Sequence, residues 1–426
     1  MKVNVEEINA VKKKVNIEIP EDHVTKEINS FYEDLRKKAK IKGFRPGKVP
    51  RNILERHFKD YVKAEVIQKL IQETYPNALS EATLQPISPP VVDPQELEIG
   101  KPFQYSAIIE VKPDIKMEGY LGLTIEGKKE EIKEEEIGER LKGLQNLHAN
   151  LKTVSEGRPV QNGDYVIIDY EGKMDGNPLE EGKAIDYSVE VGNGRFIPTF
   201  EEKLIGLRPE EEKDLEISFS DDYGYKKWAG KTVTFHVKIK EIKEKVLPLL
   251  DDEFAKDLGN YSSLEELKSQ LKQDIEREKQ SALDHRLKDQ VVDQLLQAHS
   301  FEIPESLVKD QTHVLVSDTK MRLAAQGMDL NKLGVTEEKL HENYQEMAKK
   351  QVQTFLILEK IAEQEGITVI EEEVEGRLKE ISERTHQKLD VVKRYYEKNG
   401  LIPEVKAGIL SDKTLNFLVQ KSTILT

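Results

Sequence analysis

The sequence predicts a multidomain α+β protein with an N-terminal α+β domain, a central β-rich domain and an all-α C-terminal domain. Three observations support this fold class. Apolar residues in the first 112 positions switch between alternation, typical of strands, and spacings of three and four, typical of helices. Of the 27 aromatic residues, 10 lie between Tyr165 and Phe235, which indicates a compact β-rich module. After Leu247 the pattern is helical to the end of the chain.

The first domain, residues 1–112, is predicted to contain strands and two helices. Residues 15–19 and 103–111 alternate between apolar and polar, as half-buried strands do. Apolar residues at helical spacing predict one helix that begins after Pro20 and a second that begins near Arg51. The two prolines of the intervening loop GFRPGKVP exclude a helix through it.

That loop lies in a strongly basic segment. From Arg36 to Lys63 there are 11 Lys or Arg residues and two acids, a net charge of about +9 in a chain that carries −15. Such asymmetry indicates an anionic partner at this place, while the overall charge argues against a chain that coats nucleic acid along its length. Phe44 stands beside Arg45 at the loop tip. The alternative is a solvated basic helix pair with Phe44 packed into its own domain.

A connector and the β-rich domain follow. Residues 113–151 are highly charged and predict an extended strand followed by one helix. Residues 152–243 form the β-rich domain, in which the Asp175-Gly176 pair is the strongest short-range signal for a β-hairpin. Many of its aromatic residues could simply be the core of a small β domain.

Residues 244–426 predict long helices whose apolar faces are narrow and interrupted. The serines and glutamates of 262–266 stand in capping-box spacing, and Pro304 and Pro403 mark helix starts. Such helices cannot form one thick core, but they can leave mixed apolar and polar surface open to unfolded chains. The alternative is an ordinary helical oligomerisation domain.

Several functional classes are not expected. The chain has no cysteine, which rules out disulfides, thiolate nucleophiles and cysteine-ligated zinc. His148, His285 and His386 are not in ligand spacing, so no metal is predicted. The N-terminus lacks the apolar region of a secretory signal, and no apolar run approaches the roughly 20 residues that span a bilayer. We therefore expect a cytoplasmic protein without a membrane or DNA partner.

The loop GFRPGKVP resembles the ribosome-binding signature of the trigger factor family of bacterial chaperones. The resemblance implies that Phe44, Arg45 and Lys48 contact the ribosome. The implied partner is a protein of the large subunit beside the exit tunnel, with nearby ribosomal RNA meeting the basic side chains. Position 46 varies between lysine and proline in this motif, so Pro46 removes a possible charge.

Residues 152–243 resemble an FKBP domain, through the segments DYEGK, GNGRFIPTFEEKLIGL, DDYGY and TVTFHVKI. Thr199 departs from an expected glycine, and Leu179 stands where many relatives have phenylalanine. The positions that the resemblance assigns to the active site are Tyr170, Leu179, Glu180, Tyr187, Phe196, Ile197, Phe200, Tyr225 and Phe235.

The resemblance implies a peptidyl-prolyl cis-trans isomerase that needs no cofactor. Resonance opposes rotation about a peptide bond with a barrier of about 18–20 kcal/mol. Since the planar amide is the more polar state, an apolar aromatic pocket disfavours it relative to the twisted one. Prolyl bonds are the natural substrate because only they populate the cis form appreciably. By the same resemblance, the N–H of Ile197 holds the substrate carbonyl, and Tyr225 offers a hydroxyl nearby.

Three functions are therefore weighed. The first is a ribosome-bound chaperone with isomerase activity, since the resemblance covers essentially the whole chain, including the segment LPLLDDEFAKDLG that opens the C-terminal domain. It implies nascent polypeptides as clients, roles in folding and export, and homodimerisation of the free protein. The second is a stand-alone isomerase whose flanks only dimerise it. The third is an RNA-binding protein that uses the basic loop.

Overall fold

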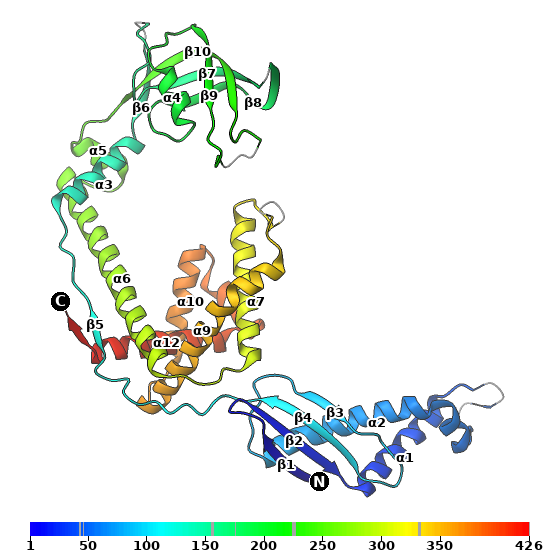
Figure 1. Cartoon of the computed structure of the whole chain (residues 1–426). Helices are drawn as coiled ribbons and strands as arrows, with labels where there is room; N and C mark the ends of the chain where they lie inside the picture. The colour runs from blue at the N-terminus through cyan, green and yellow to red at the C-terminus, as the bar shows by residue number, and fades with distance from the viewer. Residues whose placement is uncertain are drawn as a thin grey trace. The chain divides into compact units, whose positions relative to one another are not determined.

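The computed structural model describes residues 1–41, 44–45, 47–154, 157–174, 176–223, 227–330 and 334–425. The chain divides into two compact units, one made of residues 1–128 and 283–426 and the other of residues 129–282. Each unit is considered by itself (Figure 1).

The N-terminal part contains a four-stranded antiparallel sheet. Its strand order is β1-β2-β4-β3, and its strands are β1 (Lys2–Glu7), β2 (Lys12–Ile19), β3 (Val91–Pro94) and β4 (Phe103–Glu110). Val15 on β2 lies opposite Ala107 on β4, and both are fully buried, so the alternating apolar residues share one face. The predicted strands β2 and β4 are confirmed, whereas β1 and β3 were not predicted.

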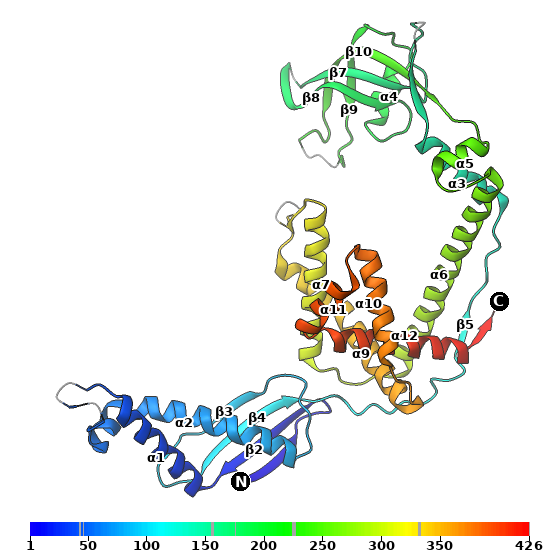
Figure 2. The same ribbon diagram turned by 180° about the vertical axis from the view of Figure 1, so that it is seen from behind.

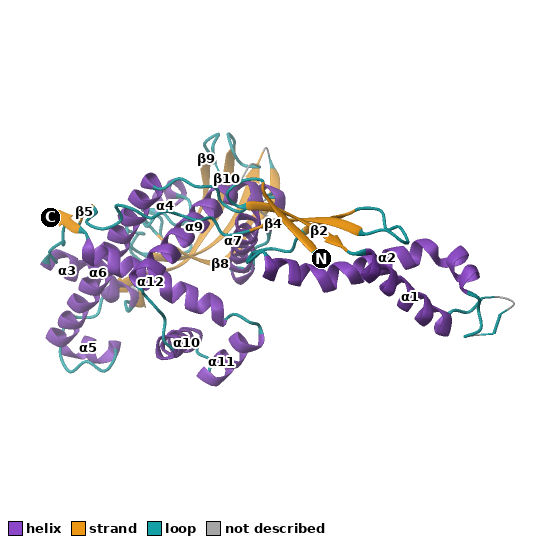
Figure 3. Ribbon diagram, turned by 90° about the horizontal axis from the view of Figure 1, so that it is seen from below, coloured by secondary structure: helices purple, strands orange, loops and turns teal. Residues whose placement is uncertain are grey.

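Two helices cover this buried face, as Figures 1 and 2 show. Helix α1 (Glu21–Lys38) begins directly after Pro20, and α2 (Arg51–Glu81) begins directly after Pro50, as predicted. The two helices form a hairpin, with the basic loop at its far end (Figure 3). Buried residues at helical spacing, among them Val24 and Ile28 on α1, join both helices to the core of the sheet.

The central part is a five-stranded antiparallel sheet. Strand β10 (Thr232–Val246) pairs with β7 (Tyr165–Met174) and also with β9 (Glu212–Ser218) and β6 (Asn150–Thr153). Strand β8 (Asn177–Glu190) pairs with β7. Met174 lies opposite Asn177 and Gly176 has a positive φ of 81°, so the predicted hairpin is confirmed; Asp175 lies outside the described residues.

The connector and the first C-terminal segment also follow the predicted pattern. Strand β5 (Thr124–Glu126) precedes α3 (Glu134–Leu147), as expected for the connector. The second unit also contains α5 (Asp252–Leu258) and the beginning of α6 (Leu264–Ala298). At the start of α6, the Ser263 hydroxyl accepts a hydrogen bond from the N–H of Glu266, whose carboxylate accepts one from the N–H of Ser262. The predicted capping interaction is therefore present, but its two hydrogen bonds involve different serines, the hydroxyl of Ser263 and the N–H of Ser262.

The rest of the C-terminal part is mostly helical. Its helices are α7 (Glu305–Ala325), α9 (Glu337–Glu365), α10 (Glu371–Thr385), α11 (Leu389–Lys398) and α12 (Ile402–Lys421). Helix α7 packs against α9, and α10 packs against both α11 and α12. The prediction of helix up to the chain end was wrong for the last residues, because β11 (Thr423–Leu425) pairs in parallel with β5. No helix among the described residues is long and apolar enough to cross a membrane.

Candidate active site and basic loop

The register of the central sheet places three of the predicted pocket residues on one face. Tyr187 lies opposite Ile168, which is two residues from Tyr170 on β7, so both tyrosines project from the same side. Phe235 lies opposite Gly172, which is two residues beyond Tyr170 on β7, so Phe235 projects from that side as well. A register shift between Ile168 and Tyr170 marks a bulge, a feature that bends a strand and redirects its side chains.

Two of the predicted pocket residues, Phe200 and Phe235, are buried phenylalanines that pack against each other. Phe200 comes from α4 (Pro198–Leu204), is fully buried and lies edge-on to Phe235, with ring centroids 5.5 Å apart. Tyr170 lies 6.0 Å from each of these two rings. Edge-to-face packing at these distances is favourable for aromatic rings and holds them in fixed orientations.

The other predicted pocket residues that the structure describes pack around these two rings. Phe196 lies 5.2 Å from both Phe200 and Tyr187, measured between ring centroids. Tyr187 is 39% exposed. Leu179 packs against the same core, and Ile197 is buried at the N-terminal end of α4.

Two predicted site residues cannot be placed. Tyr225 lies outside the described residues, and so does the side chain of Glu180, whose backbone belongs to β8. Trp228, just beyond Tyr225 in the chain, contacts the floor residue Phe235, with ring centroids 6.1 Å apart, and also contacts Phe219 at 5.3 Å.

Gly172 has a steric reason to be glycine. A Cβ atom at this position would lie 2.9 Å from the ring of Phe235, which is closer than real Cβ contacts allow. Because the ring is itself fully packed, it could not retreat without disturbing Phe200. The glycine of the DYEGK segment therefore allows the floor of the pocket to approach the sheet.

Glu201 is a structural element of the site that the sequence did not reveal. Glu201 is 1% exposed, and its carboxylate accepts three backbone hydrogen bonds, from Gly192 at 2.9 Å, Gly194 at 2.9 Å and Phe196 at 3.0 Å. These bonds fix the loop that carries the pocket wall. No local sequence pattern marked Glu201, because the burial of an acid is visible only in the structure.

The chemistry of the pocket is that of an apolar surface. Burial, and to a smaller extent the neighbouring Tyr187, raise the pKa of Tyr170, so its hydroxyl is neutral at physiological pH. The rings of Tyr170, Phe196, Phe200 and Phe235 pack against one another, and Tyr170 and Phe196 are the partly exposed members of this apolar group. Such a surface favours a state of the amide with less charge separation.

The basic loop has anchored ends. The N–H of Gly47 donates to the carbonyl of Arg36, and the Arg36 Nε donates back to the carbonyl of Gly47, both at 3.2 Å. Val49, next to the loop, is 1% exposed and packs in the core of the domain, as does Ala39 at its other end. The loop therefore leaves the helix pair from a fixed base.

The tip of the loop is exposed. Phe44 is 39% exposed, and the side chains of Arg45 and Lys48 are also exposed. Phe44 is therefore not buried within its own domain, as the alternative interpretation required. Gly43 and Pro46, which belong to the same motif, lie outside the described residues.

Comparison with known proteins agrees with this layout. Family models match as "Bacterial trigger factor protein" over residues 1–144, "FKBP-type peptidyl-prolyl cis-trans isomerase" over residues 156–240 and "Bacterial trigger factor protein C-terminus" over residues 263–420. Trigger factors from Geotalea uraniireducens and Geobacter sulfurreducens are each 37% identical over 425 residues, covering 100% of this chain and 98% and 99% of theirs. A solved structure of the trigger factor chaperone, 21% identical, covers 99% of both chains with a TM-score of 0.54.

Proposed function

Because the chain belongs to the trigger factor family, we propose that it is a ribosome-associated chaperone that also isomerises X-Pro peptide bonds. The observation that carries the catalytic part is the cluster of aromatic rings around Phe200 in the FKBP-type domain. The ribosome-binding part rests on the exposed loop in a segment of about +9 charge. We further propose that the protein acts in the cytoplasm.

The pocket performs isomerisation without covalent chemistry. The proline ring of the substrate enters between Tyr170, Phe196 and Phe235, above Phe200. The N–H of Phe196 is already donated to Glu201, so the next one, that of Ile197, is the donor we assign to the substrate carbonyl. Every 1.4 kcal/mol by which the pocket favours the twisted amide over the planar one raises the rate about tenfold.

The exposed residues of the basic loop dock the protein on the large ribosomal subunit near the exit tunnel. Arg45 and Lys48 supply cations for ribosomal RNA or for acidic side chains, and Phe44 supplies an apolar contact to a ribosomal protein. The anchored base of the loop supports this role because it limits the conformational entropy lost on docking.

The C-terminal helices provide surface for unfolded chains. Val314 and Met321 on α7 are 50% and 61% exposed, and Met347 on α9 is 48% exposed. Flexible methionines among charged residues suit weak contacts with many sequences. Free protein that is not on ribosomes forms a homodimer, as the family resemblance implies.

One experiment separates the three functions that the sequence left open. The full-length protein is mixed with ribosomes, sedimented through a cushion and assayed for isomerisation of a short prolyl peptide. We expect it to pellet with ribosomes even when free RNA is added in excess, and to isomerise the peptide. Isomerase activity without pelleting would indicate a stand-alone isomerase, and pelleting that free RNA abolishes would indicate an RNA-binding protein.

A further inference from the structure

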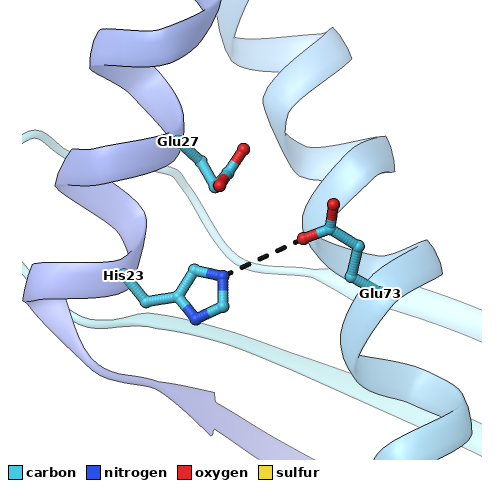
Figure 4. A group of neighbouring side chains, drawn as sticks. All are labelled: His23, Glu27 and Glu73. Atoms are coloured by element: carbon cyan, nitrogen blue, oxygen red, sulfur yellow. Dashed lines mark ion pairs between the residues drawn. The ribbon is translucent and has the colours of Figure 1, made fainter.

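A histidine and two glutamates meet between α1 and α2, away from the basic loop. His23 and Glu27 lie one turn apart on α1, so both project from the same face of the helix. Glu73 faces them from α2 (Figure 4). Among the residues that the structure describes, this is the one group of at least three potential metal ligands whose ligand atoms all lie within 4.8 Å of one another.

The geometry needs only a small change to bind a metal. The His23 Nε2 lies 3.9 Å from a carboxylate oxygen of Glu73. In a tetrahedral zinc site with bonds of about 2.0–2.2 Å, two ligand atoms are about 3.3–3.6 Å apart. His23 and Glu73 are 44% and 45% exposed, so rotation about their side-chain bonds can close this difference.

The backbone under the three ligands is held in place by the core. The residues next in sequence to the three ligands, Val24, Ile28 and Thr74, are all buried. The Thr74 hydroxyl is hydrogen-bonded to the Tyr105 hydroxyl at 2.8 Å, which fixes α2 to the sheet at this level. The ligand positions are therefore set by folding, and only side-chain entropy is lost on binding.

Lys69 is the charge that a metal would replace. Its ammonium donates a 2.5 Å hydrogen bond to Glu27 and lies 3.9 Å from Glu73. Two carboxylates and one ammonium leave the cluster with a net negative charge when His23 is neutral. Lys69 is 46% exposed and can move into solvent when a divalent cation takes its place.

We propose that His23, Glu27 and Glu73 form a Zn²⁺ site that joins α1 to α2. Imidazole nitrogen and carboxylate oxygen are both zinc ligands, and a water molecule in the fourth position would complete tetrahedral coordination. Magnesium and calcium are disfavoured because they prefer oxygen ligands alone. A metal here would fasten together the two helices that carry the basic loop, at the end of the hairpin opposite to the loop.

The test is a titration of the full-length protein with Zn²⁺ in competition with a chromophoric chelator. We expect one site, weakened at least about tenfold by His23→Ala and by Glu73→Gln. Lys69→Met should tighten it, because the competing ammonium is gone. Zn²⁺ should also raise the melting temperature of the unaltered protein but not that of Glu73→Gln.

Two control variants separate this site from other histidines. His57 is exposed on α2, roughly 24 Å along the helix from Glu73 at 1.5 Å per residue, so His57→Ala should bind zinc unchanged. His313 and His341 have ring centroids only 4.7 Å apart, and His313→Ala tests them as an alternative site. The proposal is overturned if the protein binds no zinc, or if His313→Ala abolishes binding while His23→Ala and Glu73→Gln do not weaken it.

Discussion

The aromatic pocket and the basic loop are built in opposite ways. In the pocket, Phe200 and Phe235 are almost fully buried and belong to the core of their domain. In the loop, Phe44 is 39% exposed and projects beyond the core, although Val49 anchors the loop's base. The pocket residues are part of the packing that stabilises their domain, whereas the tip of the loop contributes little to the packing of its domain.

This difference determines what mutations should do. A change in the pocket alters stability and activity together, because the same rings provide both. A change at the loop tip alters binding alone, because exposed side chains contribute little to folding. Variants in the two regions therefore test the contrast directly. The predictions below run from the largest expected change in the free energy of unfolding to the smallest.

Phe200→Ala should have the largest effect. It removes a fully buried ring that contacts Tyr170, Phe196 and Phe235, which costs about 3–5 kcal/mol of stability. It also removes the floor of the pocket, so isomerisation of a prolyl peptide should fall strongly. The measurements are chemical denaturation and peptide isomerisation at a temperature where the variant is folded.

Phe219→Ala is the matched control for this variant. It truncates another buried phenylalanine of the same domain, whose ring contacts among the described residues are with Tyr223 and Trp228. A similar loss of stability with most of the activity retained would assign the effect of Phe200 to the pocket. Equal activities in the two folded variants would mean that the pocket is misplaced.

Asp164 should make the same domain sensitive to acid. Its carboxylate is 5% exposed and is bound by both Nη atoms of Arg158, at 2.6 and 2.8 Å. Burial alone raises the pKa of Asp164, but the hydrogen bonds from Arg158 and from the N–H of Gln161 outweigh it, so the pKa lies below its ordinary value.

The sign of the pH dependence follows from this lowered pKa. The stabilisation is complete above the unfolded pKa of about 3.9 and is lost as the pH falls through the lower folded value. Asp164→Asn should cost about 1.5–3 kcal/mol at pH 7. The variant should also lose less stability than the unaltered protein when the pH is lowered from 5 to 2.5. Parallel pH profiles from denaturant melts would refute this account.

Glu201→Gln should have a smaller effect on stability but a clear one on activity. The amide group can accept only part of the three hydrogen bonds that the carboxylate accepts, which costs about 1–3 kcal/mol. The loop to Phe196 would then lose its fixed position, and isomerisation should slow. Glu202→Gln, at an exposed neighbouring position, is the control and should leave both quantities unchanged. Normal activity in Glu201→Gln would show that the carboxylate does not position the wall.

The sequence predicted the strands that carry the aromatic residues, because alternation is a local rule. Alternation predicted strand β10, whereas the FKBP resemblance supplied the proposed pocket residues, including Tyr170, Phe235 and Phe200 from α4. Nothing local marked Glu201, since acids are mostly exposed and its acceptor role depends on a loop that only the fold brings around it.

Pairings between distant segments were the other features that the sequence could not supply. β11 pairs with β5, almost 300 residues away in the chain, and neither short strand has enough residues for an alternating pattern. His23 and Glu73 likewise meet only because α1 and α2 pack together. Periodicity reports which face of an element is buried, but it does not report which partner covers that face.

The loop variant should have the smallest effect on stability and is the sharpest test of the contrast. In it, Phe44, Arg45 and Lys48 are all replaced by alanine. Their side chains are exposed, so the free energy of unfolding should change by no more than about 0.5 kcal/mol. The base of the loop should persist, because it depends on the backbone of Gly47, on the backbone and side chain of Arg36 and on buried Val49.

Ribosome binding by this triple variant should nevertheless be lost in a pelleting assay at moderate salt, while isomerisation of a prolyl peptide stays unchanged. The control replaces Lys2 and Lys101 by alanine, which removes two exposed cations from elsewhere in the same domain. If that control lost binding equally, net charge would be responsible for docking, and the loop would have no special role. If the triple variant still pelleted with ribosomes, another surface would be the contact. Loss in the triple variant alone would show that the tip of the loop, and no packing beneath it, carries the interaction.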